Sequence, residues 1–317
     1  MFSDTHCHLS HIEERGEDLS RLIAEMDARR FPFVLDIGTK PADFEGRLNK
    51  VRNAADLPSF LHFTCGLWPD GDVIADRHNA LSALEEDLRK MIALCLSRGE
   101  GERFAALGEC GLDRYWNGSR AAERAAERAA LESEEACGAG KGGGAGKASG
   151  VSDDGPGTTD TNGEEELFGL QLDVARSRKL PVIVHSRDAF VPTLGCIKNS
   201  GWDRGVIHCY SYGIPEARAF LDRGWYISFP GNITWAKKET DRERIASLVR
   251  YIPRDRLLLE TDAPYMAPAP HRGKTNTPLF IEHTYECAAA VLSMTKEALA
   301  LLVSENAKDL FVYPGPH

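Results

Sequence analysis

The sequence predicts a (β/α)8 barrel of the TIM type, with a metal site at the C-terminal ends of the strands. Eight short, apolar, β-branched runs alternate with longer segments that carry one apolar face. Continuous apolar runs are typical of strands buried on both faces, and a repeated strand–helix unit favours a closed parallel barrel. The alternative is an open, doubly wound sheet. That fold usually has fewer strands and a glycine-rich first turn, which this sequence lacks.

The predicted strands are short and rich in Val, Ile, Leu and Phe. They are Phe2–His6, Phe33–Ile37, Leu61–Leu67, Phe104–Gly108, Val182–His185, Val206–His208, Tyr226–Phe229 and Leu257–Glu260. In a barrel the carboxyl ends of such strands meet at one rim, so the residues that follow each run are candidates for function.

Helical periodicity predicts the segments between the strands. In Asp18–Arg30, for example, Leu19, Leu22, Ile23 and Met26 fall on one face. The other predicted helices are His78–Ser97, Leu167–Arg178, Ala189–Asn199, Pro215–Arg223, Asp241–Tyr251, Pro278–Leu292 and Lys296–Leu310. Within Asn306–Phe311 we expect a last helical turn that packs Leu310 and Phe311 inward.

We expect a single barrel domain over residues 1–317, because α/β barrels often use this much chain. One segment, Asn117–Gly163, breaks the pattern. It contains an Ala/Glu/Arg stretch and then a Gly/Ser/Lys/Asp stretch, which is too poor in apolar residues to form a core and is expected to be disordered. It follows the fourth predicted strand, on the active-site face. A tolerated surface insertion is favoured over a lid or partner-binding arm.

Composition narrows the possible partners and location. The formal net charge of −10 disfavours a broad duplex-coating surface, but it is compatible with a nuclease whose cationic contacts are local. Eight scattered cysteines without a CxxC pair indicate reduced thiols. Without a signal-like N-terminus or a long apolar run, we expect a cytoplasmic protein that does not bind membranes, and a monomer.

The first chemical signal is His6-Cys7-His8 at the end of the first strand. Residues i and i+2 of a strand point to one face, so both imidazoles can bind one metal, and Cys7 is expected to point away. The same alternation should turn Cys110 and Cys209 from the site. Asp4 is expected to accept a hydrogen bond from an imidazole N–H.

Four later strands each end in a residue that can bind a metal: Glu109, His185, His208 and Asp262. One buried histidine at a strand end is more often a core residue, but the complete set favours a functional site. The set suggests two divalent ions, one held by His6, His8 and Asp262 and the other by His185 and His208. Glu109 would bridge them. Paired ions suit phosphoryl displacement, and Asp262 can orient the attacking water or accept its proton, so Asp262 and Glu109 are the predicted catalytic residues.

Seven segments together resemble the TatD-type metal-dependent deoxyribonucleases, which belong to the amidohydrolase-like metallohydrolases. The segments are SDTHCHL, LGECGLD, PVIVHSRDA, IHCYS, LLLETDAPYMAP, RGKTNTP and NAKDLF. The resemblance spans nearly the whole chain apart from Asn117–Gly163.

The resemblance implies a barrel with a divalent-metal site at the same six positions. It also implies phosphodiester hydrolysis of DNA, often as a 3′-to-5′ exonuclease that prefers single strands. Zinc, manganese or magnesium serves in the family, and a histidine-rich ligand set suits zinc or manganese better than magnesium.

One departure is Gly66-Leu67-Trp68-Pro69, where the family often reads GIHP. Trp68 thus replaces a histidine near the site. It can stack on a base, a contact worth about 1–3 kcal/mol, or it can pack under a loop.

Several side chains are candidate substrate contacts. Arg187, Arg272 and Lys274 are expected to meet phosphate oxygens, although each can instead form a surface ion pair. Tyr115, Trp116 and Trp235 can stack on bases or pack within loops. Asn276 can fix the Arg272 loop or meet substrate, and Asp113 is expected to shape its own loop rather than bind metal.

Two enzymatic functions remain open. The first is a deoxyribonuclease. The second is an amidohydrolase-type enzyme that cleaves a C–N or ester bond of a small molecule, because one fold supports many reactions. A carboxylated lysine often bridges the metals in such relatives, and Glu109 at that position favours the nuclease. A non-enzymatic binding protein is disfavoured by the complete ligand set.

Overall fold

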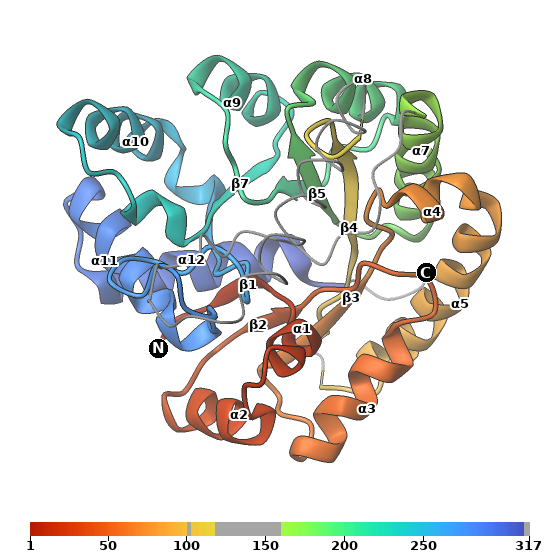
Figure 1. Ribbon diagram of the computed structural model, residues 1–317, viewed down its shortest axis with the longest axis horizontal. Helices are drawn as coiled ribbons and strands as arrows, with labels where there is room; N and C mark the ends of the chain where they lie inside the picture. The colour runs from red at the N-terminus through yellow and green to blue at the C-terminus, as the bar shows by residue number, and fades with distance from the viewer. Residues whose placement is uncertain (100–102, 118–159, 314–317) are drawn as a thin grey trace, which may run out of the picture.

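The computed structural model describes residues 1–99, 103–117 and 160–313. Eight strands form one parallel sheet in chain order, which confirms the predicted barrel (Figure 1). They are β1 (Asp4–Cys7), β2 (Val34–Asp36), β3 (Leu61–Cys65), β4 (Ala106–Asp113), β5 (Val182–Arg187), β6 (Gly205–Ile207), β7 (Tyr226–Phe229) and β8 (Leu257–Leu259).

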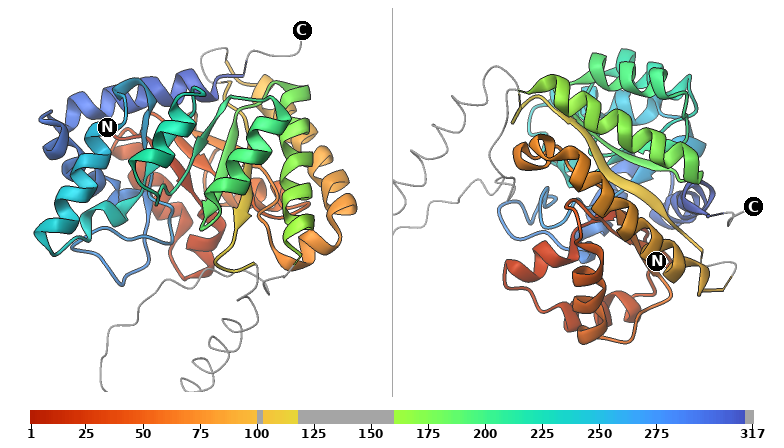
Figure 2. Two further views of the ribbon diagram at one scale, coloured as in Figure 1. Left: turned by 90° about the horizontal axis from the view of Figure 1, so that it is seen from above. Right: turned by 90° about the vertical axis from the view of Figure 1, so that its right-hand side faces the viewer.

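Helices surround the strands and stand beside them in the left view of Figure 2. They are α1 (Leu9–Glu14), α2 (Leu19–Ala28), α3 (Phe44–Ala54), α4 (Gly71–Ala75), α5 (Arg77–Leu96), α7 (Thr161–Arg178), α8 (Phe190–Ser200), α9 (Ile214–Leu221), α10 (Glu239–Tyr251), α11 (Ile281–Leu292) and α12 (Lys296–Phe311). Short 3-10 turns are η2 (Gly231–Thr234), η3 (Arg254–Arg256) and η4 (Pro278–Phe280). Helices α1, α3 and α4 were not among the predicted segments.

Local sequence explains the helix boundaries and buried faces. In α2 the predicted face is buried, and the side chain of Asp18 accepts a hydrogen bond from Arg21 N at the helix start. Thr295 caps α12 in the same way through Ala298 N. Such caps satisfy backbone N–H groups that have no partner inside the helix.

Helix α3 buries a charged residue as well as apolar ones. The guanidinium of Arg47 donates to Asp36 Oδ2 at 2.7 Å and to the Thr64 carbonyl at 2.5 Å. Asp36 Oδ1 in turn accepts from the backbone N–H of Leu9 at 2.9 Å. This buried network joins the ends of β2 and β3 to the start of α1, next to the rim of the barrel.

The barrel closes where β1 meets β8. Cys7 and Ala263 form a parallel bridge. The Asp262 N–H donates to the His6 carbonyl at 2.9 Å, and the His8 N–H donates to the Ala263 carbonyl at 2.7 Å. The closure therefore fixes the backbone of three predicted metal ligands against one another.

Helix α12 covers the opposite end of the barrel, where the dark blue helix lies across the strands in the left view of Figure 2. The Ala105 N–H donates to the Phe311 carbonyl at 3.1 Å, and Asn306 Nδ2 donates to the Leu257 carbonyl at 2.8 Å. Leu310 and Phe311 are buried, as predicted.

The two ends of the predicted insertion are ordered. Asn117 is buried and donates from Nδ2 to the Pro69 carbonyl at 2.7 Å and to Glu164 Oε1 at 2.8 Å. Helix α7 begins at Thr161, with Asp160 as its cap. The expectation of disorder concerns residues 118–159, which lie outside the described residues.

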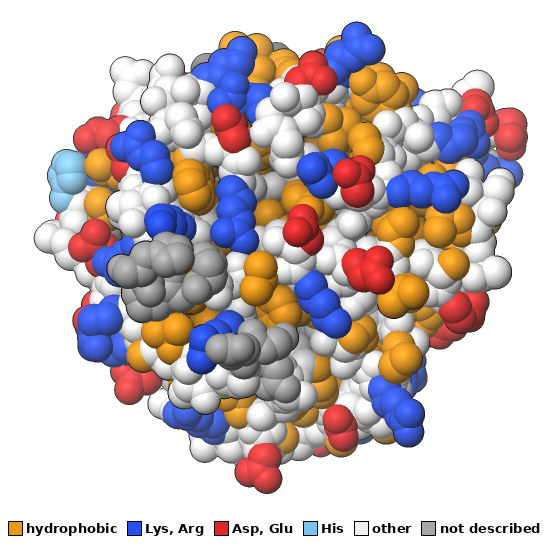
Figure 3. Space-filling model, turned by 180° about the vertical axis from the view of Figure 1, so that it is seen from behind, with side chains coloured by type: hydrophobic (Ala, Val, Ile, Leu, Met, Phe, Trp, Pro, Cys, Tyr) orange, Lys and Arg blue, Asp and Glu red, His pale blue; other side chains and the backbone are white. Residues whose placement is uncertain are grey.

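Surface charges are mixed on the face seen from behind. Figure 3 shows basic and acidic side chains interspersed over its described residues, with hydrophobic side chains in small groups. In the described part of the chain no single helix is long and apolar enough to cross a membrane. The helix pair Pro278–Leu292 and Lys296–Phe311, which is bent by 104°, is long and apolar enough to cross a membrane by length and composition only.

Candidate metal centre

The six predicted ligand residues meet at the rim formed by the C-terminal ends of the strands. His6, Glu109 and His185 lie within β1, β4 and β5, while His8, His208 and Asp262 follow β1, β6 and β8 closely. Five of the six are buried, and His185 is half-buried. Their side chains form two groups that share Glu109.

The first group contains His6, His8 and Asp262. The Nε2 atoms of His6 and His8 lie 3.2 Å apart. Each of these atoms is 3.7 Å from Asp262 Oδ1. Glu109 Oε2 completes the group at 3.3 Å from His6 Nε2 and 3.7 Å from His8 Nε2.

The second group contains His185 and His208. His185 Nδ1 and His208 Nε2 lie 3.2 Å apart. Glu109 Oε1 is 3.0 Å from the first and 2.8 Å from the second.

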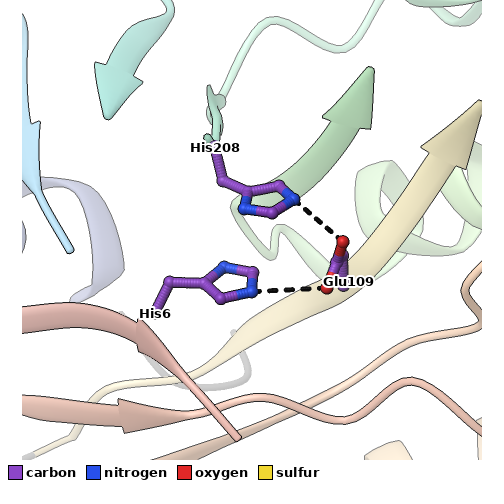
Figure 4. A group of neighbouring side chains, drawn as sticks. All are labelled: His6, Glu109 and His208. Atoms are coloured by element: carbon purple, nitrogen blue, oxygen red, sulfur yellow. Dashed lines mark ion pairs between the residues drawn. The ribbon is translucent and has the colours of Figure 1, made fainter. Parts of the chain in front are cut away.

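The carboxylate of Glu109 therefore stands between the two groups, with one oxygen toward each. Figure 4 shows this arrangement for His6 and His208, whose imidazoles face different oxygens of Glu109. It is the geometry of a carboxylate that bridges two ions.

The spacing of these atoms fits divalent metal ions. Two donors that each lie about 2.1 Å from one tetrahedral ion are about 3.4 Å apart. The distances within the two groups run from 2.8 to 3.7 Å. Imidazole and carboxylate donors together suit zinc or manganese. The site thus offers four donor atoms to one ion and three to a second.

A bulge in β4 directs Glu109 into the site. The β4–β5 register shifts between Leu107 and Cys110, where β4 uses one residue more than β5. Gly111 then pairs with His185 at φ +140°, and a Cβ atom there would lie 2.0 Å from the His185 carbonyl oxygen. Only glycine permits this approach, which brings Glu109 and His185 to the same place.

The electrostatics of the cluster suit cation binding. Burial opposes ionisation of Glu109, but the imidazoles of His208, His185 and His6 outweigh it and hold the pKa of this carboxyl well below its usual range. The pKa of Asp262 is also lowered, because its contacts with His8 and His6 outweigh burial. Both carboxylates are therefore anionic at neutral pH.

The pKa values of the histidines are shifted in opposite directions by their surroundings. Burial, reinforced by His208, lowers the pKa of His6. For His185, burial acts downward, but hydrogen bonds to Asp113 and Glu109 raise the pKa to about 9. Glu109 and Glu260 likewise raise the pKa of His208 despite its burial. Without an ion, His185 and His208 therefore tend to be protonated, and a metal ion must displace these protons to bind.

Asp113 is a functional candidate that the sequence interpretation placed only in its own loop. Its Oδ1 does accept hydrogen bonds from the backbone of Tyr115 and Trp116, at 2.9 Å each. Its Oδ2, however, lies 2.9 Å from His185 Nε2. A carboxylate at that position orients the ring and leaves Nδ1 for a metal.

Asp4 does not have the contact expected from the sequence. It accepts from the backbone N–H of His6 at 3.2 Å and of Thr261 at 2.9 Å, and from Thr261 Oγ1 at 2.6 Å. It therefore joins β1 to β8 rather than orienting an imidazole. Burial raises the pKa of Asp4 to about 7.

The centre opens into a cleft with a volume of about 790 Å³. Three of the predicted substrate or stacking residues line it, namely Trp68, Arg187 and Trp235. Tyr115 lies beneath Arg187, whose guanidinium carbon is 3.7 Å from the ring centroid. Trp68 packs its edge against His185, at 5.8 Å between ring centroids.

Other predicted contacts lie further from the centre. Arg272 is exposed and sits 4.5 Å above the ring of Trp235, outside the cleft lining, and Lys274 is also exposed. Asn276 is buried and donates to the carbonyls of Thr261 and Tyr265, so it fixes its loop. Trp116 contacts Tyr115 edge-on, at 5.1 Å.

Several lining residues were not anticipated, among them Lys40, Tyr265 and Cys209. Lys40 and Tyr265 lie in loops, where no strand pattern marks them. Cys209 lines the cleft although alternation predicted that it would point away. It follows the end of β6 and has φ +46°, so it no longer obeys the alternation of a strand. Cys7 and Cys110 do turn away, toward the carbonyls of Leu35 and Ile183.

Known proteins resemble the chain along its length. The family model described as "TatD related DNase" matches residues 3–137 and 149–312. The uncharacterized metal-dependent hydrolase YcfH of Escherichia coli K12 is 30% identical over 97% of this chain and 94% of its own. YabD of Bacillus subtilis, also an uncharacterized metal-dependent hydrolase, is 27% identical over 98% and 99%. The crystal structure of the TatD homologue YJJV from E. coli superposes with a TM-score of 0.68 at 22% identity, over 99% and 98%.

Proposed function

The chain belongs to the TatD-related DNase family of metal-dependent hydrolases, and we propose that this member is a deoxyribonuclease that removes nucleotides from the 3′ ends of single-stranded DNA. The observation that carries the proposal is the carboxylate of Glu109, which offers Oε1 to His208 at 2.8 Å and Oε2 to His6 at 3.3 Å. Two cations held on one carboxylate are suited to in-line displacement at phosphorus.

The residues of the centre would have different roles in the reaction. One divalent ion would be held by His6, His8 and Asp262. The other would be held by His185 and His208, and Glu109 would bind both ions. When bound, such ions supply an activated water near neutral pH and offset the charge that develops on phosphoryl oxygens. Asp262 is ionised and lies at the cleft, so it is the candidate acceptor of the proton from the attacking water.

Arg187 is the best-placed contact for the phosphoryl group. It lines the cleft beside His185, and its stacking on Tyr115 reduces the freedom of its guanidinium. A preoriented guanidinium can donate two parallel hydrogen bonds to phosphate oxygens. Trp68, Trp235 and Tyr265 give the cleft walls aromatic surface, which suits unpaired bases.

Cleavage of end-labelled oligonucleotides tests the proposal. We expect single-stranded DNA to be shortened from its 3′ end in the presence of manganese or zinc, and the reaction to stop after chelation. The Glu109→Gln variant should lose activity by at least about 100-fold, because it removes the bridging charge. The exposed Glu85→Gln variant is the matched control and should retain full activity.

The same protein samples should be offered a panel of small amides and esters. Metal-dependent turnover of that panel, with intact oligonucleotides, would establish the amidohydrolase-type alternative instead. Parallel 5′-labelled, 3′-labelled and RNA substrates decide polarity and sugar preference.

A further inference from the structure

Outside the cleft, two histidines face each other across a loop and a helix. His271 lies in the loop after β8, and His283 lies in α11. Their Nε2 atoms are 3.1 Å apart, as close as the donor pairs of the main centre. Both side chains are partly exposed, so an ion from solvent can reach them.

Each ring is held in its orientation by a neighbour. The ring of His271 stacks on Phe280, with centroids 3.9 Å apart and planes 3° from parallel. His283 Nδ1 lies 3.4 Å from Glu286 Oε2. A carboxylate at Nδ1 favours a proton on that nitrogen and leaves the lone pair of Nε2 free, as in carboxylate–histidine–metal arrangements.

The surroundings favour a cation. Both histidines line a cavity of about 400 Å³, and its charged lining contains four carboxylates (Glu17, Asp18, Glu25 and Glu282) and two guanidinium groups (Arg21 and Arg29). The carboxylates therefore outnumber the cationic groups around the two imidazoles.

We infer that His271 and His283 form an accessory site for a transition-metal ion of borderline softness, such as nickel, copper or zinc. Two imidazoles are suited to these ions and not to magnesium or calcium, which prefer oxygen donors. Water or a lining carboxylate would complete the coordination. Without an ion, one imidazole donates its Nε2 proton to the other, and the ion would replace that hydrogen bond.

The position of the site suggests what its occupation does. His271 directly precedes Arg272, whose guanidinium lies over Trp235 at the wall of the cleft. An ion shared with His283 would fasten this loop to α11, and so would steady the Arg272–Trp235 contact. The inference does not depend on the reaction at the main centre.

Metal counting on the full-length protein tests the site. Metal-free protein is dialysed against nickel, and bound ions per chain are measured by mass spectrometry for the wild type and for His271→Gln, His283→Gln and His78→Gln. The first two variants should each bind one nickel ion fewer than the wild type. His78→Gln changes an exposed histidine elsewhere and should match the wild type. Equal counts in all four proteins would overturn the inference.

Hydrogen exchange gives a second, independent measurement. Nickel should slow backbone amide exchange in residues 268–276 of the wild type, and this protection should vanish in His283→Gln. If nickel protects this loop equally in both proteins, the ion acts elsewhere and the accessory site is refuted.

Discussion

The carboxylate of Asp113 lies 2.9 Å from His185 Nε2, on the side of the ring that faces away from Glu109. This contact holds the Nε2 proton, so Nδ1 is the nitrogen that can bind an ion. The proposed role of His185 as a ligand therefore depends on Asp113, a residue outside the proposed ligand set. Replacement of such orienting groups typically costs 10- to 100-fold in metal affinity or activity.

The Asp113→Asn substitution tests this dependence. The amide oxygen can still accept the backbone N–H groups of Tyr115 and Trp116, so the loop should keep its shape. We expect metal affinity, measured by competition with a chelator, to fall by about 10- to 100-fold. Asp56→Asn, at an exposed position, is the control. Unchanged affinity in Asp113→Asn would show that the charge of Asp113 is dispensable.

Arg187 and Arg272 should differ in their effect on catalysis. Arg187 lines the cleft and Arg272 does not. Loss of a charged hydrogen bond to substrate costs about 1.5–3 kcal/mol, so Arg187→Met should lower kcat/KM for oligonucleotides by about 10- to 150-fold. Metal content should be unchanged. Arg272→Met should have a clearly smaller effect, and the opposite ranking would assign phosphate binding to the Arg272 loop.

Gly111 should tolerate no side chain. A Cβ atom there would meet the His185 carbonyl at 2.0 Å, and φ +140° is unfavourable for any other residue. The backbone conformation alone costs about 1–3 kcal/mol, and the collision adds to this. Gly111→Ala should therefore lower the free energy of unfolding and the affinity for metal together.

Gly46→Ala is the matched control for that experiment. Gly46 lies exposed within α3, and a Cβ atom there would have no neighbour within 4 Å. Alanine should stabilise the helix by about 0.5–1 kcal/mol. Urea unfolding of both variants compares them directly. A Gly111→Ala protein as stable as the wild type would mean that β4 and β5 can move apart at this position without a loss of stability.

The buried Arg47 network should be sensitive to removal of one partner. Arg47→Leu leaves Asp36 buried without its 2.7 Å ion pair. Breaking a buried pair in this way costs about 3–5 kcal/mol. Arg52→Leu, an exposed change on the same helix, should cost little. Adding Asp36→Asn to Arg47→Leu should recover part of the stability. A double variant less stable than Arg47→Leu alone would show that the unpaired charge of Asp36 is not the cause of the loss.

His62 should make the stability of the protein dependent on pH. Burial, aided by Arg98, lowers the pKa of His62 to about 3. The unfolded chain binds a proton near pH 6.5 but the folded protein does not, so stability falls as pH decreases from about 6.5 toward 3, by about 1.4 kcal/mol per unit.

His62→Gln should flatten this dependence. Urea unfolding between pH 7 and 4.5 should show a smaller slope for the variant than for the wild type. His78→Gln, with an exposed side chain, should give a curve parallel to the wild type. Identical slopes for His62→Gln and the wild type would mean that His62 is protonated in the folded protein.

The sequence predicted the barrel because its periodicities are strong. The runs at β7 and β8 are almost uniformly apolar, and the predicted Tyr226–Phe229 is the strand observed. Helix α3 was missed because its inner face includes Arg47, which weakens the helical pattern of Phe44, Leu48 and Val51. Buried charge in a helix face can be recognised only once its partner is known.

The candidate metal ligands could also be predicted from the strand pattern. His6 and His8 lie at the end of the first strand and Asp262 lies shortly after the last, and parallel strands bring such positions together. The contact of Asp113 with His185 was not predicted, because β4 continues to residue 113, beyond its predicted end at Gly108. Cys209 was misjudged because its positive φ lies outside any periodic pattern.

The hydrogen bonds between the first and last strands have a consequence for biosynthesis. Because the carbonyl of His6 receives the Asp262 N–H, the chain must be translated past β8 before His6, His8 and Asp262 can assemble. A ribosome-bound or truncated polypeptide that lacks β8 has the imidazoles but not the scaffold that gathers them. An ion held by His6, His8 and Asp262 would therefore bind only after β8 has joined β1, and it would link the two ends of the barrel at this junction.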